Sequence, residues 1–530
     1  MNGCNVIIIV LNAHTPFVRH PEVSRSPEER WFFDAVSETY IPLLEVFDRL
    51  DRDHVPFRMG IVLSPILCHM LRDEHILDRY LAHVDRQIEF GREELARNAG
   101  AEEYRHLAQL FCEDMAAKRR FFTERCGGDL LPVFDYYQKK GRIEILTTAA
   151  TYAFLPFYAK FPEAVQAQLE VAVNACRGVF GRSPQGFWLP ELGWSAGLDK
   201  YLKMYNFGYT ILETHGAVLG EPFAGRGSFY PVKTPAGIPV LSRDYYARRD
   251  IEDPGGFPQD PVYRDYYADA GYELPVTMVR PFLEAQGIRT QTGYKYWASG
   301  VRGTEKRIYD PRLAAEKVRE HARSFLEARI SRLNQAGAFM KEQAVNLCAY
   351  NADRFGRFWY EGPQFIEALF REGAFRREVQ FMNPAEYLYK QHPASFQTVV
   401  PEFSSWGVNG YAEMWLDASS DWMYCHSVRA LERMIEIADR FPDDTGLKER
   451  ALNQAAREIL LVQSSDWAGM LYRQEHAEYA RNQIEGSLRN FTTIYESLGS
   501  NYISTEWLTS LERRHNIFPA INYRIFRRKS

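Results

Sequence analysis

Short apolar runs alternate with longer amphipathic segments along most of this chain. The apolar runs predict buried β-strands, and they cover residues 6–11, 143–146, 186–190, 209–212, 240–242 and 344–350. The amphipathic segments repeat apolar side chains at helical spacing and predict helices, at residues 27–50, 71–123, 164–180 and 312–333. Residues 60–70 fit a strand that runs into a helix. Strands that alternate with helices predict a parallel α/β barrel.

Two segments depart from this alternation. Residues 245–305 are rich in Tyr, Gly, Pro and Asp and have little periodicity, so we expect a long ordered loop region over a site. Residues 410–515 are mostly helical in pattern, and a short strand is expected at 521–526. We therefore expect a barrel over residues 1–400, an inserted helical subdomain at 71–130 and a C-terminal helical domain over 401–530.

The charge balance excludes some classes of partner. Lys and Arg number 64 and Asp and Glu number 69, which gives a formal charge of −5. Nucleic acids and anionic membranes need a basic surface, so neither is an expected partner. No apolar run approaches the ~20 residues that span a bilayer, and residues 1–11 lack the basic start and cleavage site of a signal peptide. Seven cysteines without CxxC spacing predict a reduced, cytoplasmic protein without a structural zinc site.

Polar side chains follow the predicted strands where the strands end, and in a parallel barrel these positions carry function. Glu191 follows a Trp-Leu-Pro sequence, a setting that suits a nucleophile on a sugar carbon. A surface Glu at a loop start has the same pattern. His14 and His215 are candidates too, but each also fits a satisfied core histidine. Asp353 is either a second carboxylate or a turn cap.

Aromatic residues make up 14% of the chain, which indicates either a large core or a cleft that stacks sugar rings. Trp406 lies beside a glycine, with Trp415 close behind it, and Trp467 follows Asp466. A tryptophan is both a core residue and a stacking surface, so both interpretations stay open at these positions.

A series of ordered segments runs along nearly the whole chain. It comprises the opening Asn12-Ala13-His14-Thr15-Pro16 and residues 19–22, 29–31, 38–42, 152–156, 186–191, 260–264, 293–296, 350–363, 404–407 and 464–467. Together these segments resemble glycoside hydrolase family 57, and most closely its 1,4-α-glucan branching enzymes. The resemblance implies an α/β fold, an incomplete (β/α)7 barrel with an inserted helical subdomain and a C-terminal helical domain. It also implies an α-1,4-glucan partner, such as glycogen, amylose or a maltooligosaccharide.

The same resemblance implies roles for individual residues. It implies a retaining mechanism without a metal or other cofactor, in which Glu191 attacks the anomeric carbon. In branching enzymes the 6-hydroxyl of another glucan chain then attacks the glycosyl-enzyme. The residues expected to bind substrate are His14, Trp188, His215, Trp359, Trp406, Trp415, Asp466 and Trp467.

The sequence departs from the family pattern at the acid/base position. The family's acid/base Asp aligns with Asn351, and an amide does not exchange a proton in the needed range. Losing a general acid typically costs about 10²–10⁴ in rate. Asn12, Tyr152 and Arg357 stand where the family has histidines. A shifted register would make Asp353 the acid, since residues two apart lie on one face of a strand. Tyr350, Phe355 and Gly356 argue against the shift, because they match the family pattern without a gap.

Three hypotheses follow from these observations. The first is an α-glucan branching transferase or related α-glucan hydrolase. The second is a glucan-binding protein on the same scaffold, without turnover. The third is a protein that binds an anionic sugar through Arg354 and Arg357, unless these arginines pair with Asp353 or a neighbouring carboxylate.

Overall fold

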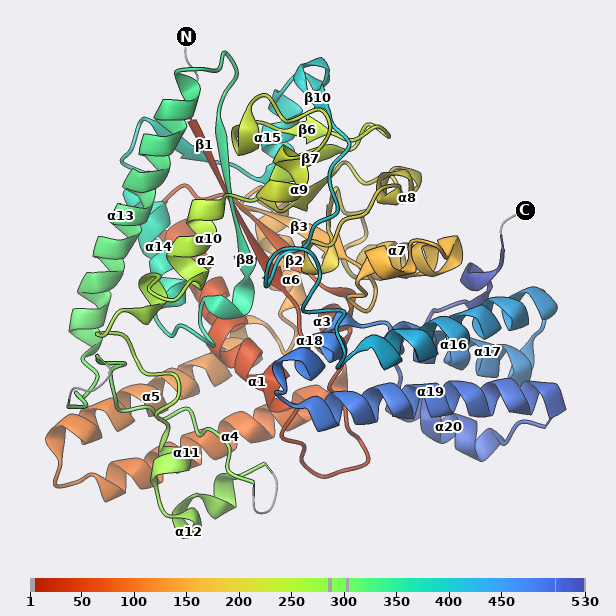
Figure 1. Cartoon of the computed structure of the whole chain (residues 1–530). Helices are drawn as coiled ribbons and strands as arrows, with labels where there is room; N and C mark the ends of the chain where they lie inside the picture. The colour runs from red at the N-terminus through yellow and green to blue at the C-terminus, as the bar shows by residue number, and fades with distance from the viewer. Residues whose placement is uncertain (1–4, 285–287, 302–304, 501, 529–530) are drawn as a thin grey trace. The chain divides into compact units, whose positions relative to one another are not determined.

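The computed structural model describes residues 5–284, 288–301, 305–500 and 502–528, and its contacts divide the chain into two compact units (Figure 1). The first unit comprises Met1–Gly60, Met70–Glu144 and Tyr245–Asn383. The second unit comprises Ile61–His69, Ile145–Asp244 and Pro384–Ser530. Each unit is made of several segments that are separated in the sequence, unlike the domains predicted at 1–400 and 401–530. The predicted domain boundaries, including those of the helical subdomain at 71–130, stay a prediction.

The sheet of the first unit is built around β1 (Asn5–Ala13). β8 (Val345–Asn351) and β9 (Val379–Phe381) both pair with β1 in parallel. Nearly all of β1 is buried, as expected for a parallel strand that is covered on both faces. The strands predicted at 6–11 and 344–350 are confirmed, whereas β9 is too short to give a sequence pattern.

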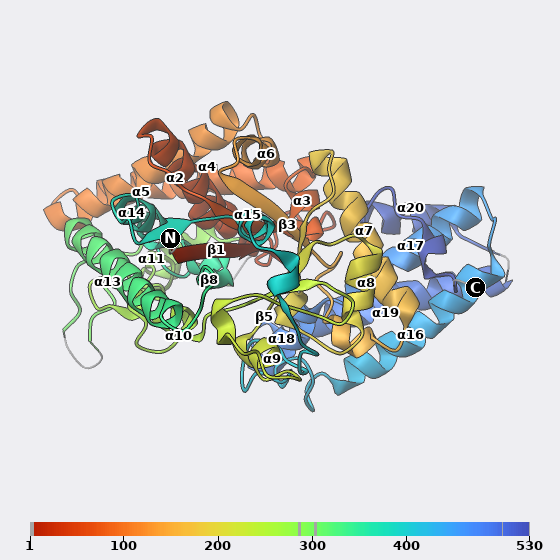
Figure 2. The same ribbon diagram turned by 90° about the horizontal axis from the view of Figure 1, so that it is seen from above.

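The first unit also contains helices, of which α4 (Glu74–Arg97) and α5 (Glu102–Arg120) lie in the helical segment predicted at 71–123. The others are α1 (Arg30–Ala35), a π-helix (Val36–Tyr40), α2 (Ile41–Arg52), α6 (Leu131–Lys139), α10 (Tyr245–Glu252), α11 (Ala270–Glu273), α12 (Val276–Val279), α13 (Pro311–Gly337) and α14 (Gly362–Gly373). α13 begins where the Asp310 side chain accepts hydrogen bonds from two backbone N–H groups and Pro311 follows. α4 and α5 lie side by side in Figures 1 and 2 and share an Arg119–Asp85 ion pair.

Two predictions for this unit were wrong in part. The helix expected from residue 27 begins at Arg30, because the Ser26 hydroxyl bonds the Glu28 carboxylate instead of capping a helix. The region 245–305 is not loop throughout, because α10 buries Ala247 and Ile251 against the unit.

The second unit holds the rest of the sheet. β3 (Ile143–Thr148), β4 (Gly186–Trp188), β5 (Tyr209–Leu212) and β7 (Pro239–Ser242) pair in parallel in that order. β6 (Val232–Lys233) is antiparallel to β7, and β10 (Gln397–Thr398) extends this edge in parallel with β6. β2 (Met59–Leu63) leads into α3 (Pro65–Met70), so the strand and helix expected at 60–70 are confirmed.

The helices of this unit fall before, between and after its strands. They are α7 (Pro162–Phe180), α8 (Leu198–Met204), α9 (Thr214–Val218), α15 (Pro384–Lys390), α16 (Asp421–Arg440), α17 (Gly446–Val462), α18 (Ser465–Arg473), α19 (Ala477–Ser500) and α20 (Thr505–Arg514). The helical pattern predicted over 410–515 is confirmed from α16 onward. The strand predicted at 521–526 is wrong, because Tyr523–Phe526 forms a 3₁₀-helix capped by Asn522.

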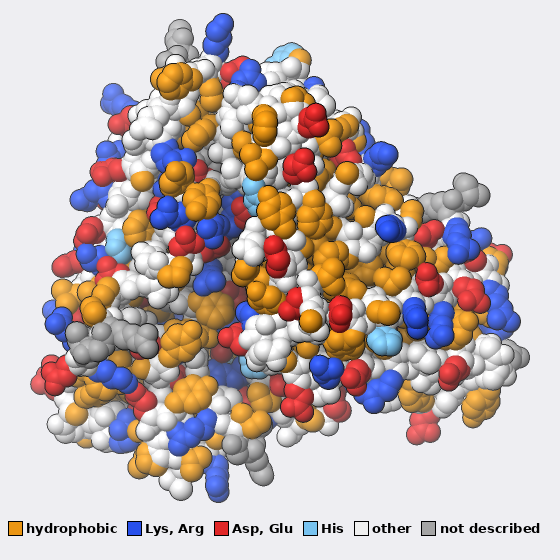
Figure 3. Space-filling model, viewed as in Figure 1, with side chains coloured by type: hydrophobic (Ala, Val, Ile, Leu, Met, Phe, Trp, Pro, Cys, Tyr) orange, Lys and Arg blue, Asp and Glu red, His pale blue; other side chains and the backbone are white. Residues whose placement is uncertain are grey.

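The surface and composition agree with a protein built around a buried α/β core. Lysine, arginine and acidic side chains are interspersed on the face shown in Figure 3. No helix in the described part of the chain is long and apolar enough to cross a membrane. The six cysteines within the described ranges are all free thiols.

Candidate active site

Glu191 has an unusual backbone conformation. It lies three residues after the last residue of β4, and its φ of 57° and ψ of 18° lie in the left-handed region, as does the φ of 50° at Leu192. Such conformations cost on the order of 1–3 kcal/mol each at non-glycine residues and persist only where neighbours hold them. The Glu191 carbonyl accepts a hydrogen bond from the Trp406 backbone N–H at 2.8 Å, and the Leu192 N–H bonds the Leu189 carbonyl at 2.8 Å. The backbone is therefore held so that the Glu191 carboxylate points inward.

Two donors orient the Glu191 carboxylate, which is only 9% exposed. The Trp406 indole Nε1–H donates to Oε2, and the Ser465 hydroxyl lies 2.8 Å from Oε1. The Ser465 hydroxyl also lies 2.9 Å from the Tyr152 carbonyl, so its single hydrogen serves one acceptor at a time. A buried carboxylate needs such partners to stay ionised, and these two leave the carboxylate fixed in one orientation.

Tyr152 forms part of the same cluster. Its hydroxyl accepts a hydrogen bond from Trp188 Nε1 at 3.2 Å. Burial, and next the negative charge of Glu191, raise the pKa of Tyr152 well above its usual value. Tyr152 is therefore a neutral phenol beside Glu191.

An aromatic floor lies beneath this carboxylate. The Trp188 and Trp406 rings meet edge to face with centroids 5.5 Å apart. Trp188 is fully buried, so it supports Trp406 rather than presenting a surface of its own. The Arg243 guanidinium lies 5.5 Å above the Trp406 ring and donates to Glu213 Oε1 at 2.7 Å. The buried ion pair between Arg243 and Glu213 therefore helps to hold the Trp406 ring in place.

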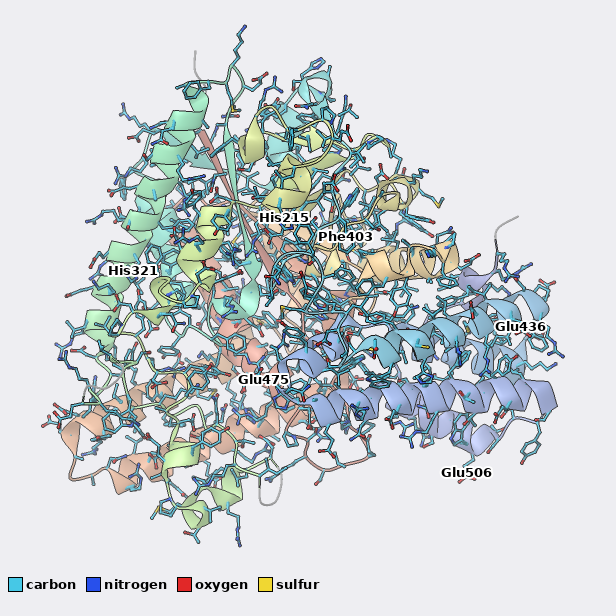
Figure 4. The ribbon with its side chains drawn as sticks, viewed as in Figure 1. His215, His321, Phe403, Glu436, Glu475 and Glu506 are labelled. Carbon is cyan, nitrogen blue, oxygen red and sulfur yellow. The ribbon has the colours of Figure 1, made fainter. Side chains whose placement is uncertain are left out.

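His215 and Trp415 hold the segment that carries Trp406. The His215 Nε2 lies 2.8 Å from the Gly410 carbonyl, and its ring contacts Tyr411 at 5.1 Å; Figure 4 labels His215 and the neighbouring Phe403. Trp415 is buried and stacks on Phe154 with centroids 5.7 Å apart and planes 5° from parallel. Both residues fix the loop in this structure, and direct contact of either with a sugar stays a prediction.

Asp466 and Trp467 lie at the start of α18. Ser464 caps this helix, and its hydroxyl donates to Asp466 Oδ2 at 2.7 Å. Asp466 lies close enough to Tyr152 to raise its pKa, although less than burial and Glu191 do. Trp467 is buried and its indole N–H donates to the Leu461 carbonyl at 2.9 Å, which gives it a packing role in the helical region.

The first unit carries Asn351 at the end of β8. The strand register places it opposite Asn12 of β1, and Asn12 Nδ2 donates to Asn351 Oδ1 at 2.9 Å. Asn351 is exposed and Asn12 is buried. The side chains at the ends of β1 and β8 are therefore hydrogen-bonded to each other.

Asp353 is paired with an arginine. Its Oδ2 lies 3.1 Å from Arg357 Nη1, while its buried Oδ1 has no hydrogen bond to any described residue. Burial raises the pKa of Asp353, and the charges of Arg357 and, more weakly, His14 act against that rise. His14 follows β1 and is half-buried. The pairing of Arg357 with Asp353 is the alternative to an anionic-sugar site that the sequence left open.

Trp359 takes a core position. Its ring packs against Tyr263, Phe355 and Phe365 at centroid distances of 5.5, 6.0 and 5.1 Å, and it is almost completely buried. Its expected contact with substrate therefore stays a prediction, without support from its exposure.

The structure brings together residues that the sequence left far apart. Glu191, Trp188 and Trp406 form one cluster, and Ser465 joins it from 274 positions away. Their roles in catalysis and substrate binding stay predictions. Ser465 was missed as a site residue, and only its place in the segment 464–467 pointed to it. Among the described residues, no group of three His, Cys, Asp or Glu side chains is arranged to hold a metal ion.

A parallel α/β sheet with an oriented carboxylate over tryptophans at a strand end defines the class of barrel glycoside hydrolases. The chain belongs to glycosyl hydrolase family 57, whose family model matches residues 8–400. The model of the 1,4-alpha-glucan branching enzyme C-terminal domain matches residues 426–526. The fold is an incomplete (β/α)7 barrel with an inserted helical subdomain and a C-terminal helical domain, as predicted.

Relatives of two kinds resemble the chain over its full length. It is 27% identical to a 1,4-alpha-glucan branching enzyme of Thermococcus kodakarensis, over 97% of this chain and 77% of that protein. The solved alpha-amylase AmyC of Thermotoga maritima is 32% identical, with a TM-score of 0.93 over 99% of this chain and 100% of that one. The solved branching enzyme of Pyrococcus horikoshii is 25% identical, with a TM-score of 0.89 over 99% and 97%.

Proposed function

We propose that this chain acts on α-1,4-glucan, with Glu191 as the nucleophile of a retaining mechanism and Asn351 at the acid/base position. The observation that carries the proposal is the Glu191 carboxylate, held by Trp406 and Ser465 in a strained, buried turn. Strain and fixed orientation at a carboxylate are typical of functional sites. The family and its branching-enzyme and amylase members support the substrate class.

The chemistry divides into two steps. Glu191 attacks C1 of a glucose unit, the bond from C1 to the leaving O4 breaks, and that oxygen takes up a proton. In the second step a 6-hydroxyl of another glucan chain attacks C1, gives up its proton and releases Glu191, which creates an α-1,6 branch. Water in place of the 6-hydroxyl gives hydrolysis instead. Branching is the favoured outcome, since the model of the C-terminal domain and the Thermococcus relative carry it in their descriptions.

Proton transfer is the weak point of this mechanism. Asn351 cannot supply the proton to the leaving oxygen, which costs about 10²–10⁴ in rate. Asp353 is the candidate for a substitute acid, and two observations favour it: its raised pKa and its buried Oδ1 without a hydrogen bond. Its ion pair with Arg357 argues against it, because the pair stabilises the charged form. If neither group serves, the chain is a glucan-binding protein without turnover.

The test is incubation of the purified protein with amylose. New α-1,6 branches, measured as chain lengths after enzymatic debranching, establish transfer. New reducing ends without branches establish hydrolysis. Retention on a glucan-containing gel with unchanged amylose establishes the binding protein. A protein that is neither retained nor active on amylose overturns the proposal.

A further inference from the structure

A separate pocket lies in the first unit, where the end of α4, the start of α5 and α11 meet at the lower left of Figure 1. Its volume is about 310 Å³, at the lower end of the ~300–1,000 Å³ that is common for small-molecule sites. None of the residues expected to act in catalysis lines it. The side chains that matter for its chemistry are Arg97, Asn98, Tyr104, Glu273, Tyr296 and Trp297.

Aromatic rings form a fixed corner in this pocket. The Tyr104 ring contacts Trp297 at 6.0 Å with an interplanar angle of 82°, and Tyr296 at 5.5 Å with an angle of 64°. The Trp297 indole N–H donates to Glu273 Oε2 at 2.9 Å, and the Tyr296 hydroxyl donates to Glu94 Oε2 at 2.7 Å. Because hydrogen bonds already hold the Trp297 and Tyr296 rings, a ligand that packs against them loses little free energy to ordering these side chains.

The charges around the pocket cancel in pairs. Arg97 donates to both Glu94 carboxylate oxygens, at 2.8 and 2.5 Å. Lys306 lies 2.9 Å from Glu273 Oε1 and 5.3 Å above the Trp297 ring. A pocket without net charge does not favour a phosphate or carboxylate ligand, so the chemistry points to a neutral ligand.

Polar groups remain available beside the aromatic corner. Asn98 is only 6% exposed; its Nδ2 donates to the Glu94 carbonyl at 2.9 Å, but no described residue donates to its Oδ1. The Tyr104 hydroxyl likewise has no hydrogen bond to a described residue. Apolar ring faces next to spare donors and acceptors suit a molecule with C–H faces and a hydroxyl rim, which describes a pyranose ring.

The geometry points to a second, non-catalytic α-glucan-binding pocket, which takes one end or branch of a glucan polymer at Trp297 and Tyr104. The choice of α-glucan over other neutral sugars rests on the proposed function. A second site on the same chain raises the local concentration of a polymer at the first site, so it strengthens binding of long glucans much more than of short ones.

The experiment measures binding of glycogen and of maltoheptaose to the full chain and to four variants. Ala101→Trp fills the pocket from its exposed rim and leaves the core untouched, and Trp297→Ala removes the aromatic wall. Trp406→Ala weakens the cleft at Glu191. Tyr267→Ala is the matched control, because this aromatic residue is 80% exposed and does not line the pocket. Circular dichroism confirms that each variant is folded.

We expect Ala101→Trp and Trp297→Ala to bind glycogen about tenfold more weakly, the scale of one aromatic contact, with Tyr267→Ala unchanged. Trp406→Ala should keep glycogen binding that disappears when Ala101→Trp is added. If Ala101→Trp binds glycogen like the parent, or Trp406→Ala alone removes all binding, the pocket is not a glucan site while the proposed function stands. A parent that binds neither glycogen nor maltoheptaose overturns both.

Discussion

Asn351→Asp is the change that most directly tests the proposed chemistry. Asparagine and aspartate have the same shape, and Asn351 is exposed at the end of β8, so the variant has no reason to misfold. Asn12 Nδ2, now 2.9 Å from the amide oxygen, would donate to a carboxylate oxygen in the same place. The substitution therefore adds one ionisable oxygen and keeps the surrounding contacts.

The expected gain follows from two opposing effects. A restored general acid contributes about 10²–10⁴ in rate. The hydrogen bond from Asn12 favours the ionised carboxylate and lowers its pKa, which reduces the fraction that carries a proton at neutral pH. We therefore expect the variant to gain about 100-fold over the parent near pH 7, at the lower end of that range, and to gain more as the pH falls toward 5.

The assay is formation of α-1,6 branches in amylose, followed from pH 5 to 8 for the parent and the variant. Asn351→Ala is the matched control, since it removes the amide without supplying an acid, and it should behave like the parent. Adding Glu191→Gln to Asn351→Asp should abolish the gain. The reasoning fails if the parent already matches Asn351→Asp and Asp353→Asn abolishes that activity, because Asp353 is then the acid. If Asn351→Asp gains nothing, the missing acid is not the sole defect, and the site also needs the histidines that the family pattern has at positions 12, 152 and 357.

Three further substitutions, at Trp406, Glu284 and Gly356, test individual contacts in the structure. Trp406→Phe removes the N–H that donates to Glu191, a hydrogen bond to charge worth about 1.5–3 kcal/mol; glycosyl-enzyme formation, measured by single-turnover kinetics, should slow about 10–100-fold. Glu284 is buried, which raises its pKa, but a histidine and an arginine of α4 outweigh burial and lower the pKa from 4.5 to about 2. Its stabilisation is thus present above its unfolded pKa and lost as the pH falls toward 2, so Glu284→Gln should lower the free energy of unfolding in urea by about 3 kcal/mol at pH 7 and by almost nothing below pH 2; an equal loss at both pH values contradicts the assignment. Gly356 has a φ of 138°, and a Cβ there would overlap the Glu38 carbonyl oxygen. Gly356→Ala should therefore lower the free energy of unfolding by about 3 kcal/mol or more in the same urea assay. A loss under ~1 kcal/mol would show that the π-helix Val36–Tyr40, which carries Glu38, can move aside.

Local patterns predicted the elements better than their boundaries. The strand at 209–212 is confirmed residue for residue, because Gly208 and Glu213 mark the two ends of its short buried run. The helix start near residue 27 was misplaced, since the Ser26 hydroxyl found a side-chain partner in place of a backbone N–H. The strand predicted at 521–526 is a 3₁₀-helix in the structure, in which Tyr523 and Phe526 are buried.

The sequence by itself determined the family and the alternation of strands and helices, and it singled out Glu191 as the candidate nucleophile, since these depend on residue types and local spacing. Only the tertiary structure decided that Ser465 and Trp406 hold this carboxylate, and that Asp353 is paired with Arg357. Those contacts join segments far apart in the chain or depend on side-chain direction. Residue types and spacing do not specify such contacts, because a side chain finds its partner only once the strands and loops that carry both have packed together.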